Sequence, residues 1–219
     1  MPPWSRTPWW GEVDRYGALT ARTYDLLSGD PVYAVGRRLA IPAMGLRPGW
    51  RVLDLGCGTG LNLPALLDGV GPMGRVVGLD RSPAMLAVAR RKRAGSSGAG
   101  QLRLVQGDMA DPQAAREAAA GQPFDAVIAT YALSLTPDPA RVWRTVTGVL
   151  RPGAAVAVVD MARPTGRAAL AAPLARLACR LGGADIDAHP WTVVEPELTL
   201  TRAWSRWAGH VRVLVGTWG

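Results

Sequence analysis

The chain has 219 residues, 48% hydrophobic and 19% charged, which suits one domain with a sizeable core and excludes a disordered chain. It contains no apolar run of the ~20 residues that a membrane-spanning helix needs, and its first residues lack the apolar core of a signal peptide, so we expect a cytoplasmic protein. Its net charge of +8 comes mostly from arginines spread along the chain, which favours a compositional bias over a nucleic-acid surface. The two cysteines, Cys57 and Cys179, and the two histidines form no metal-ligand pattern, so we expect no metal.

Residues 1–45 are predicted to form a segment separate from the main domain, 46–219. Residues 1–20 are rich in Trp, Pro and Gly and are predicted to be irregular. Residues 21–45 predict two helical pieces that are separated at Pro31, because proline breaks a helix interior.

Residues 52–60 combine a buried strand with a glycine-rich turn. The turn places Gly56, Gly58 and Gly60 two residues apart, and glycine there allows a positive φ and close approach of a ligand to the backbone. Asp54 would be a costly charge inside a parallel strand unless something pairs with it, which indicates a ligand contact. The dinucleotide fingerprint requires a different spacing, Gly-x-Gly-x-x-Gly.

Strands and helices then alternate, which predicts a parallel sheet covered on both faces. Strands are expected at 75–80, 101–106, 124–129 and 155–160, and helices at 61–70, 83–93, 112–120 and 139–149. Ser82 is the expected N-cap of the helix that starts at Pro83. Asp80, Asp108 and Tyr131 fall at strand ends, where ligands bind in such sheets.

Residues 161–192 interrupt the alternation and are predicted to be an insert at the substrate site. Within it, 167–181 reads as an apolar, arginine-bearing helix that is interrupted or kinked at Pro173. A core helix with solvated arginines is the plainer interpretation, and a helix lying on a membrane surface is the other. Residues 198–204 and 210–217 predict a terminal antiparallel hairpin.

The run Asp-Leu-Gly-Cys-Gly-Thr-Gly at 54–60 resembles motif I of the class I S-adenosylmethionine (SAM)-dependent methyltransferases. Gly-Asp-Met at 107–109 resembles the next motif of that family, and 21–45 resembles the N-terminal lid helices of its ubiquinone/menaquinone and phospholipid methyltransferases. The resemblance implies a Rossmann-like α/β fold with a seven-stranded, mostly parallel sheet, a terminal antiparallel hairpin and helices on both faces. It also implies SAM as the cofactor and a small molecule or lipid as the acceptor.

The same resemblance implies the cofactor contacts. Asp80 would accept hydrogen bonds from the ribose hydroxyls, and Asp108 from the adenine amino group, although an N-cap of the following helix is the alternative for Asp108. Cys57 has the alternative role of a small residue in a tight turn. The full set of expected cofactor-binding residues is Tyr24, Arg38, Asp54, Gly56, Cys57, Gly58, Asn62, Asp80, Arg81, Asp108, Met109 and Thr130.

Tyr131 and His189 are the expected catalytic residues, with His210 a further candidate for a general base. A base is needed only where the acceptor must lose a proton, and a lone histidine is more often structural. The chain lacks the Asn/Asp-Pro-Pro-aromatic motif of enzymes that methylate nucleic-acid amino groups, so we expect no nucleic-acid partner. A lipid amine, a quinone-like or a polyketide-like acceptor, methylated on N, O or C, fits a monomer or homodimer that touches the membrane peripherally. A SAM-binding module without catalysis is the alternative, and a nicotinamide-dependent oxidoreductase is disfavoured.

Overall fold

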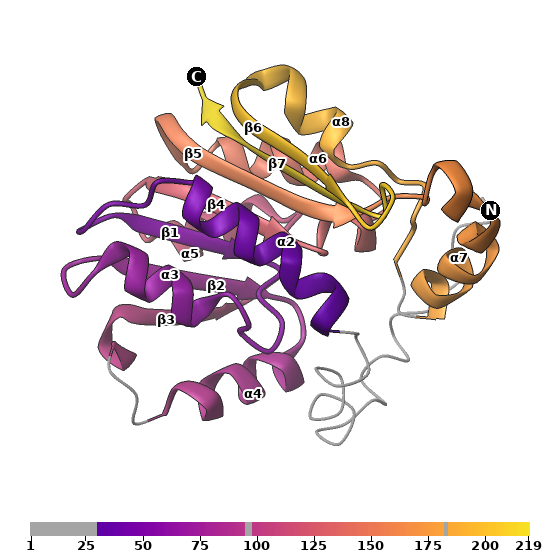
Figure 1. The fold of residues 1–219 in the computed structure, drawn as a ribbon. Helices are drawn as coiled ribbons and strands as arrows, with labels where there is room; N and C mark the ends of the chain where they lie inside the picture. The colour runs from indigo at the N-terminus through magenta and orange to yellow at the C-terminus, as the bar shows by residue number, and fades with distance from the viewer. Residues whose placement is uncertain (1–29, 95–97, 182–183) are drawn as a thin grey trace, which may run out of the picture.

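A seven-stranded sheet forms the centre of the computed structural model, which describes residues 30–94, 98–181 and 184–219 (Figure 1). The strand order is β3-β2-β1-β4-β5-β7-β6, with β1 to β5 parallel and β7 antiparallel to both of its neighbours. The strands are β1 (Arg51–Leu55), β2 (Arg75–Asp80), β3 (Leu102–Gln106), β4 (Phe124–Thr130), β5 (Leu150–Met161), β6 (Leu198–Arg206) and β7 (Val211–Trp218). The predicted fold class and the terminal hairpin are therefore confirmed.

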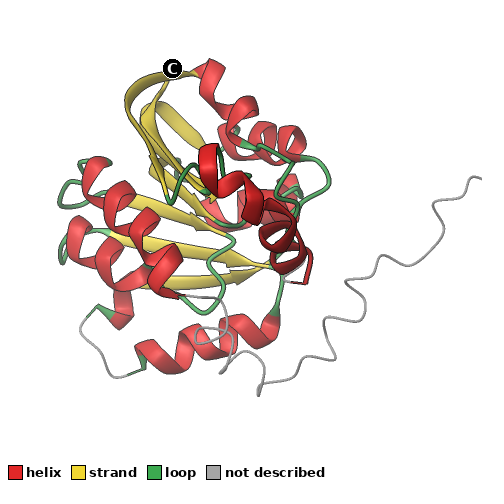
Figure 2. Ribbon diagram, turned by 45° about the vertical axis from the view of Figure 1, so that its right-hand side comes forward, coloured by secondary structure: helices red, strands yellow, loops and turns green. Residues whose placement is uncertain are grey.

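Helices cover both faces of this sheet (Figure 2). One face packs against α2 (Asp30–Ala43), α3 (Leu63–Val70) and α4 (Pro83–Arg93), and the other against α5 (Pro112–Ala119), α6 (Pro139–Thr147) and α8 (Trp191–Val194). Neighbouring strand residues alternate between the two cores, as Val52 and Leu53 do, because successive side chains of a strand point to opposite faces. Both residues are fully buried, as strands covered on both faces require, and the central strands are mostly apolar, with the buried Asp54, Asp125 and Asp160 as exceptions.

Short helices complete the connections. They are η2 (Ala99–Gln101), η3 (Leu133–Leu135), η4 (Gly166–Ala171) and η5 (Glu195–Glu197), and η4 leads directly into α7 (Ala172–Leu181) beyond the end of β5. The interruption expected at Pro173 is this change of helix type, with Pro173 as the second residue of α7. In the same way Pro31 is the second residue of α2, a position that tolerates its missing N–H. The helical piece expected before Pro31 lies outside the described residues.

The N-terminal caps of α4 and α5 can be compared with the residues that the sequence predicted for them. Ser82 caps α4, since its hydroxyl accepts a hydrogen bond from the backbone N–H of Met85 at 3.3 Å, as predicted. The cap of α5 is Asp111, which accepts from the N–H of Gln113 at 2.9 Å. The alternative role of Asp108 as this N-cap is therefore wrong, and its carboxylate lies at the end of β3 instead.

α2 lies close against the sheet near the carboxyl ends of β4 and β5. A Cβ atom at Gly36 would stand 2.4 Å from a methyl carbon of Val159 and 2.5 Å from the hydroxyl oxygen of Tyr131. Only glycine allows this approach, which brings α2 over the edge of the sheet where the strand-end acids gather. In the described ranges, every helix is too short or too polar to cross a bilayer.

Candidate functional site

The glycine turn after β1 is tied to the end of β2. The backbone N–H groups of Gly56 and Cys57 both donate to the carbonyl oxygen of Leu79, at 2.8 and 3.1 Å. Gly56 has a φ of +67°, and a Cβ there would stand 2.5 Å from Cβ of Ala132. The thiol of Cys57 is buried against Gly78 of β2, and burial raises its pKa. Cys57 thus fills the turn with its side chain and does not aim its thiol at the cavity.

Asp80 closes the same turn from the other side. Its two carboxylate oxygens accept backbone hydrogen bonds from Gly58 and Ser82, each at 2.8 Å. Burial raises the pKa of Asp80, and these two hydrogen bonds oppose that rise. Each carboxylate oxygen has a second acceptor position, so Asp80 retains the capacity to bind a pair of hydroxyl groups.

Asp54 forms a buried polar group with Asn62 and Thr130. The side-chain amide of Asn62 donates to Asp54 at 2.8 Å and to the hydroxyl of Thr130 at 3.0 Å. Burial raises the pKa of Asp54 to about 7, and the charge of Asp80 adds to the rise, while Asn62 and the charge of Arg37 oppose it. One oxygen of Asp54 and the amide oxygen of Asn62 have no partner among the described residues. Buried acceptors left unpaired are costly, so this group fits a ligand that brings positive charge or N–H donors.

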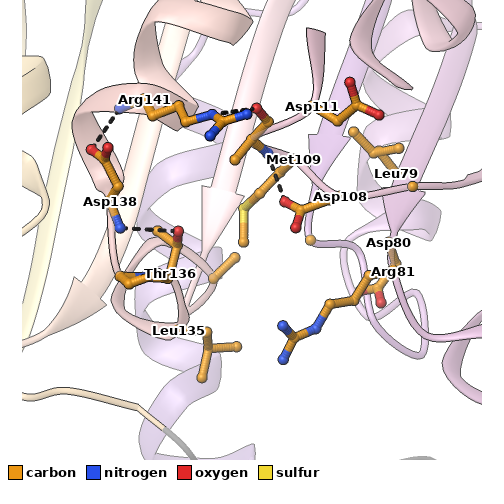
Figure 3. A pocket seen from close by; sticks show the side chains of 15 residues that line it. Leu79, Asp80, Arg81, Asp108, Met109, Asp111, Leu135, Thr136, Asp138 and Arg141 are labelled. Atoms are coloured by element: carbon orange, nitrogen blue, oxygen red, sulfur yellow. Dashed lines mark hydrogen bonds between the residues drawn. The ribbon is translucent and has the colours of Figure 1, made fainter. Parts of the chain in front are cut away.

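A cavity of about 330 Å³ opens at the carboxyl edge of β1 to β4 (Figure 3). Arg81 and Leu135 face each other across its mouth, and the side chains of Asp108 and Met109 extend into it from the loop after β3. Asp108 is exposed and uses one oxygen to accept from the N–H of Ala110 at 2.8 Å, so its other carboxylate oxygen retains the capacity to accept from a ligand. The lining residues are Gly56, Leu79, Asp80, Arg81, Gly107, Asp108, Met109, Ala110, Asp111, Ala132, Leu135, Thr136, Pro137, Asp138 and Arg141.

The structure therefore brings most of the expected cofactor residues to one edge of the sheet, with two exceptions. Tyr24 lies outside the described residues, and Arg38 is exposed on α2. Its neighbour Arg37 is half-buried, and its charge lowers the pKa of Asp54. The sequence does contain a signal that favours Arg37 over Arg38. Gly36 and Ile41 lie on the buried face of α2, and a helix of 3.6 residues per turn places Arg37 nearer that face than Arg38.

Tyr131 stands apart from the cavity. It has a φ of +55°, and its hydroxyl donates to the backbone carbonyl of Tyr33 in α2 at 2.8 Å. The two rings pack with their centroids 4.8 Å apart, and the ring of His210 lies 6.1 Å beyond that of Tyr33. Tyr131 therefore fastens α2 to the end of β4 and forms part of an aromatic row there.

The two histidines have different surroundings. His189 is exposed in the loop before α8, where its ring stacks near Trp191 at 5.1 Å, and it does not line the cavity. His210 is half-buried in the turn directly before β7, with its Nδ1 2.8 Å from the carbonyl oxygen of Ala162. A carbonyl oxygen only accepts, so Nδ1 carries the proton in the neutral ring and Nε2 presents a lone pair. Among the described residues, no cluster of His, Cys, Asp or Glu is arranged to hold a metal ion.

A parallel sheet that ends in an antiparallel hairpin, with a glycine turn and three strand-end acids at one edge, defines the Rossmann-like fold of the methyltransferases. Two solved structures share the fold. A SAM-dependent methyltransferase from Aquifex aeolicus aligns with a TM-score of 0.62 over 92% of this chain and 98% of its own, at 17% identity. An O-methyltransferase family protein from Burkholderia thailandensis aligns with a TM-score of 0.66 over 91% of this chain and 57% of its own, at 20% identity.

Residues 46–183 match the methyltransferase domain family, and the chain belongs to that family. Two curated relatives act on quinones according to their names. A 2-phytyl-1,4-naphtoquinone methyltransferase of Synechococcus elongatus is 36% identical over 147 residues, which are 66% of this chain and 61% of the relative. A demethylmenaquinone methyltransferase of Staphylococcus aureus is 34% identical over 133 residues, 61% of this chain and 52% of the relative. The match thus spans between half and two thirds of each relative's length.

Proposed function

We propose that the protein is a SAM-dependent methyltransferase that acts on a small apolar or lipid-like acceptor, with quinone-like rings as the first class to test. The observation that carries the proposal is the unpartnered pair of buried oxygens on Asp54 and Asn62, which flank the glycine turn, while Gly56 of that turn lines the cavity together with Asp80 and Asp108. A ligand with an ammonium group, two ribose hydroxyls and an adenine amino group requires hydrogen-bond acceptors for each of these three parts. The oxygens of Asp54 and Asn62, of Asp80 and of Asp108 provide them in that order along the sheet edge.

Each residue has one task in this proposal. Asp54 and Asn62 bind the ammonium end, with Arg37 tuning the charge of Asp54, while Asp80 binds the ribose and Asp108 the adenine amino group. When bound, SAM supplies a methyl group on a positively charged sulfur. The protein contributes position and exclusion of water, which are the main requirements of a direct displacement.

The acceptor is proposed to bind at the end of β4 and β5, under α2 and the insert. Tyr33, Tyr131 and Leu135 pack there against a buried cluster of Met161, Cys179, Ala184 and Ile186, which joins the insert to the sheet. The wall is apolar and aromatic, as a ring-shaped acceptor requires. Residues 1–45 as a lid and 161–192 as the substrate-site insert are part of the proposal.

The geometry favours His210 over His189 as the general base for an acceptor that must lose a proton. His210 has its tautomer set by Ala162, and its ring extends the aromatic row of Tyr33 and Tyr131. Tyr131 is proposed to act by position, because its hydroxyl is already donated to Tyr33. A lipid-like acceptor resides in a bilayer, so a peripheral membrane contact belongs to the same proposal, and a nucleic-acid partner does not.

Calorimetric titration with SAM, S-adenosylhomocysteine and NAD tests the cofactor. We expect micromolar binding of the first two and none of NAD. Methyl transfer from labelled SAM to reduced naphthoquinones without a ring methyl, and to phosphatidylethanolamine, then tests the acceptor. Binding of SAM without transfer to any acceptor would favour a non-catalytic SAM-binding module, and binding of NAD would overturn the cofactor assignment.

A further inference from the structure

The segment that follows β5 exposes a row of leucines. Leu170 in η4 is 93% exposed, and Leu174 and Leu177 in α7 are 71% and 55% exposed. Leu174 and Leu177 are three residues apart and lie on one side of α7, and Leu170 precedes them in η4. Three leucines this exposed within eight residues give the segment an apolar surface, of the kind that marks a contact with a partner or a membrane.

The tip of the β6–β7 hairpin is fixed beside the start of this segment. The backbone N–H and the hydroxyl of Thr165 both donate to the carbonyl oxygen of Ala208, at 2.7 and 3.0 Å. Trp207, next to Ala208 in the turn, is 57% exposed. An amphipathic ring of this kind favours the boundary between water and acyl chains. The hairpin tip and η4 thus present exposed apolar groups at the same edge of the molecule, where α7 lies in Figure 1.

Arginines accompany these apolar groups. Arg163 and Arg176 both form ion pairs with Asp187. The two arginines also line a cavity of about 390 Å³ between η4 and α7, whose other walls are the apolar side chains of Ala169, Ala172, Pro173 and Leu177. From 163 to 187 the sequence has four arginines and two acids, and Arg206 adds one more positive charge at the hairpin tip. The sequence of this segment therefore carries a net positive charge next to the exposed leucines, which complements an anionic lipid surface.

We propose that Leu170, Leu174, Leu177 and Trp207, which we call the docking face, insert into the headgroup region of a bilayer that contains anionic lipids. The docking face lies at the carboxyl edge of β5, the edge that carries the acceptor wall. Docking through it turns the acceptor wall toward the membrane, so that an apolar acceptor reaches the site from the bilayer. This inference deepens the proposed function and rests on it only for the identity of the acceptor.

Co-sedimentation of the full chain with vesicles tests the docking face. We expect the protein to bind vesicles of phosphatidylcholine mixed with phosphatidylglycerol at low salt, and to bind them more weakly without phosphatidylglycerol or at high salt. The double variant Leu174→Glu/Leu177→Glu should lower the affinity at least about tenfold, since two exposed leucines no longer enter the bilayer. The matched control is Met73→Glu, because Met73 is 78% exposed in the loop before β2, at the opposite edge of the sheet, and should leave binding unchanged.

Three results would overturn the inference. They are no binding to anionic vesicles at low salt, an equal loss of binding in the Met73→Glu control, and a dimer in light scattering that the leucine variant dissociates. The last result would assign the face to a second copy of the chain. SAM titration of the same preparations separates the two proposals. Intact SAM binding without vesicle binding removes the docking face alone, and absent SAM binding removes the proposed function alone.

Discussion

The carboxylate of Asp80 accepts a hydrogen bond of 2.8 Å from the backbone N–H of Gly58, and so joins the end of β2 to the glycine turn after β1. The same carboxylate is proposed to bind the ribose. Asp80→Ala should therefore weaken SAM binding by about 1–3 kcal/mol, because charge-assisted hydrogen bonds are lost. Calorimetry measures the change, with Asp68→Ala as the control because Asp68 is exposed on α3. An unchanged affinity of the Asp80 variant would remove it from the cofactor site.

Gly56 and Gly58 form a matched pair for testing the turn. Both have positive φ, at +67° and +53°, but a Cβ at Gly56 would stand 2.5 Å from Ala132, whereas a Cβ at Gly58 would meet open space. Gly58→Ala should lower the free energy of unfolding by about 1 kcal/mol through backbone strain alone. Gly56→Ala should lower it by about 2–4 kcal/mol, because overpacking adds to the strain. Urea unfolding of the two variants checks this order, and equal losses would show that the contact with Ala132 relaxes freely.

Asp54 should make the protein less stable as the pH rises. Burial raises its pKa from the ordinary 3.8 to about 7, so the folded protein holds a proton that the unfolded chain releases between those values. The contribution to stability is full below about pH 4, falls as the pH rises and is lost above about pH 7, by up to about 4 kcal/mol. Asp54→Asn should therefore lose less stability than the wild type between about pH 5 and about pH 8.

Urea unfolding of both proteins at the two pH values measures this difference. Asp160 is buried with its pKa raised to about 6, so it acts in the same direction, but it is present in both proteins and cancels in the comparison. Parallel pH dependences would show that Asp54 ionises normally, and that the unpartnered oxygen is satisfied within the protein.

Variants of Arg37 and Arg38 test which of these two arginines of α2 contributes to SAM binding. The charge of Arg37 lowers the pKa of Asp54, whereas Arg38 is exposed. Arg37→Met should weaken SAM binding by about tenfold, or ~1.4 kcal/mol, because Asp54 then ionises less readily. Arg38→Met should change the affinity less than about twofold. Calorimetry with both variants decides, and the reverse order would restore Arg38 as the contact.

The positions of the turn glycines and of the strand-end acids could be predicted from the sequence, because the backbone geometry of a parallel sheet determines where they lie. Gly56, Asp80 and Asp108 follow from a parallel sheet whose carboxyl ends share one edge. The side chain of Tyr131 could not be placed in the same way, since its hydroxyl meets Tyr33, a residue 98 positions earlier in the chain. Contacts of that range depend on how α2 packs over the sheet.

The same dependence on long-range packing explains why the sequence analysis selected Arg38 and not Arg37, and why it did not predict the whole docking face. The period of the helix favours Arg37 over Arg38, but the sequence does not show how closely α2 approaches the sheet at Gly36, and this approach brings the charge of Arg37 near enough to lower the pKa of Asp54. The arginine-bearing helix at 167–181 was predicted, but its neighbour Trp207 was not, because the hydrogen bonds of Thr165 to Ala208 join segments that are 43 residues apart.

Variants of His210 and His189 test which histidine accepts the proton that the acceptor loses. His210 holds its Nδ1 2.8 Å from the carbonyl of Ala162, so Nε2 is the nitrogen that can take a proton, while His189 is exposed beside Trp191. With a reduced naphthoquinone as acceptor, His210→Gln should lower kcat by about 10²-fold or more and leave SAM affinity unchanged, since a positioned base contributes about 10²–10⁴-fold. His189→Gln should leave both values unchanged. An undiminished kcat in the His210 variant would mean that the acceptor loses its proton to water, and a loss confined to the His189 variant would assign the base to the loop before α8.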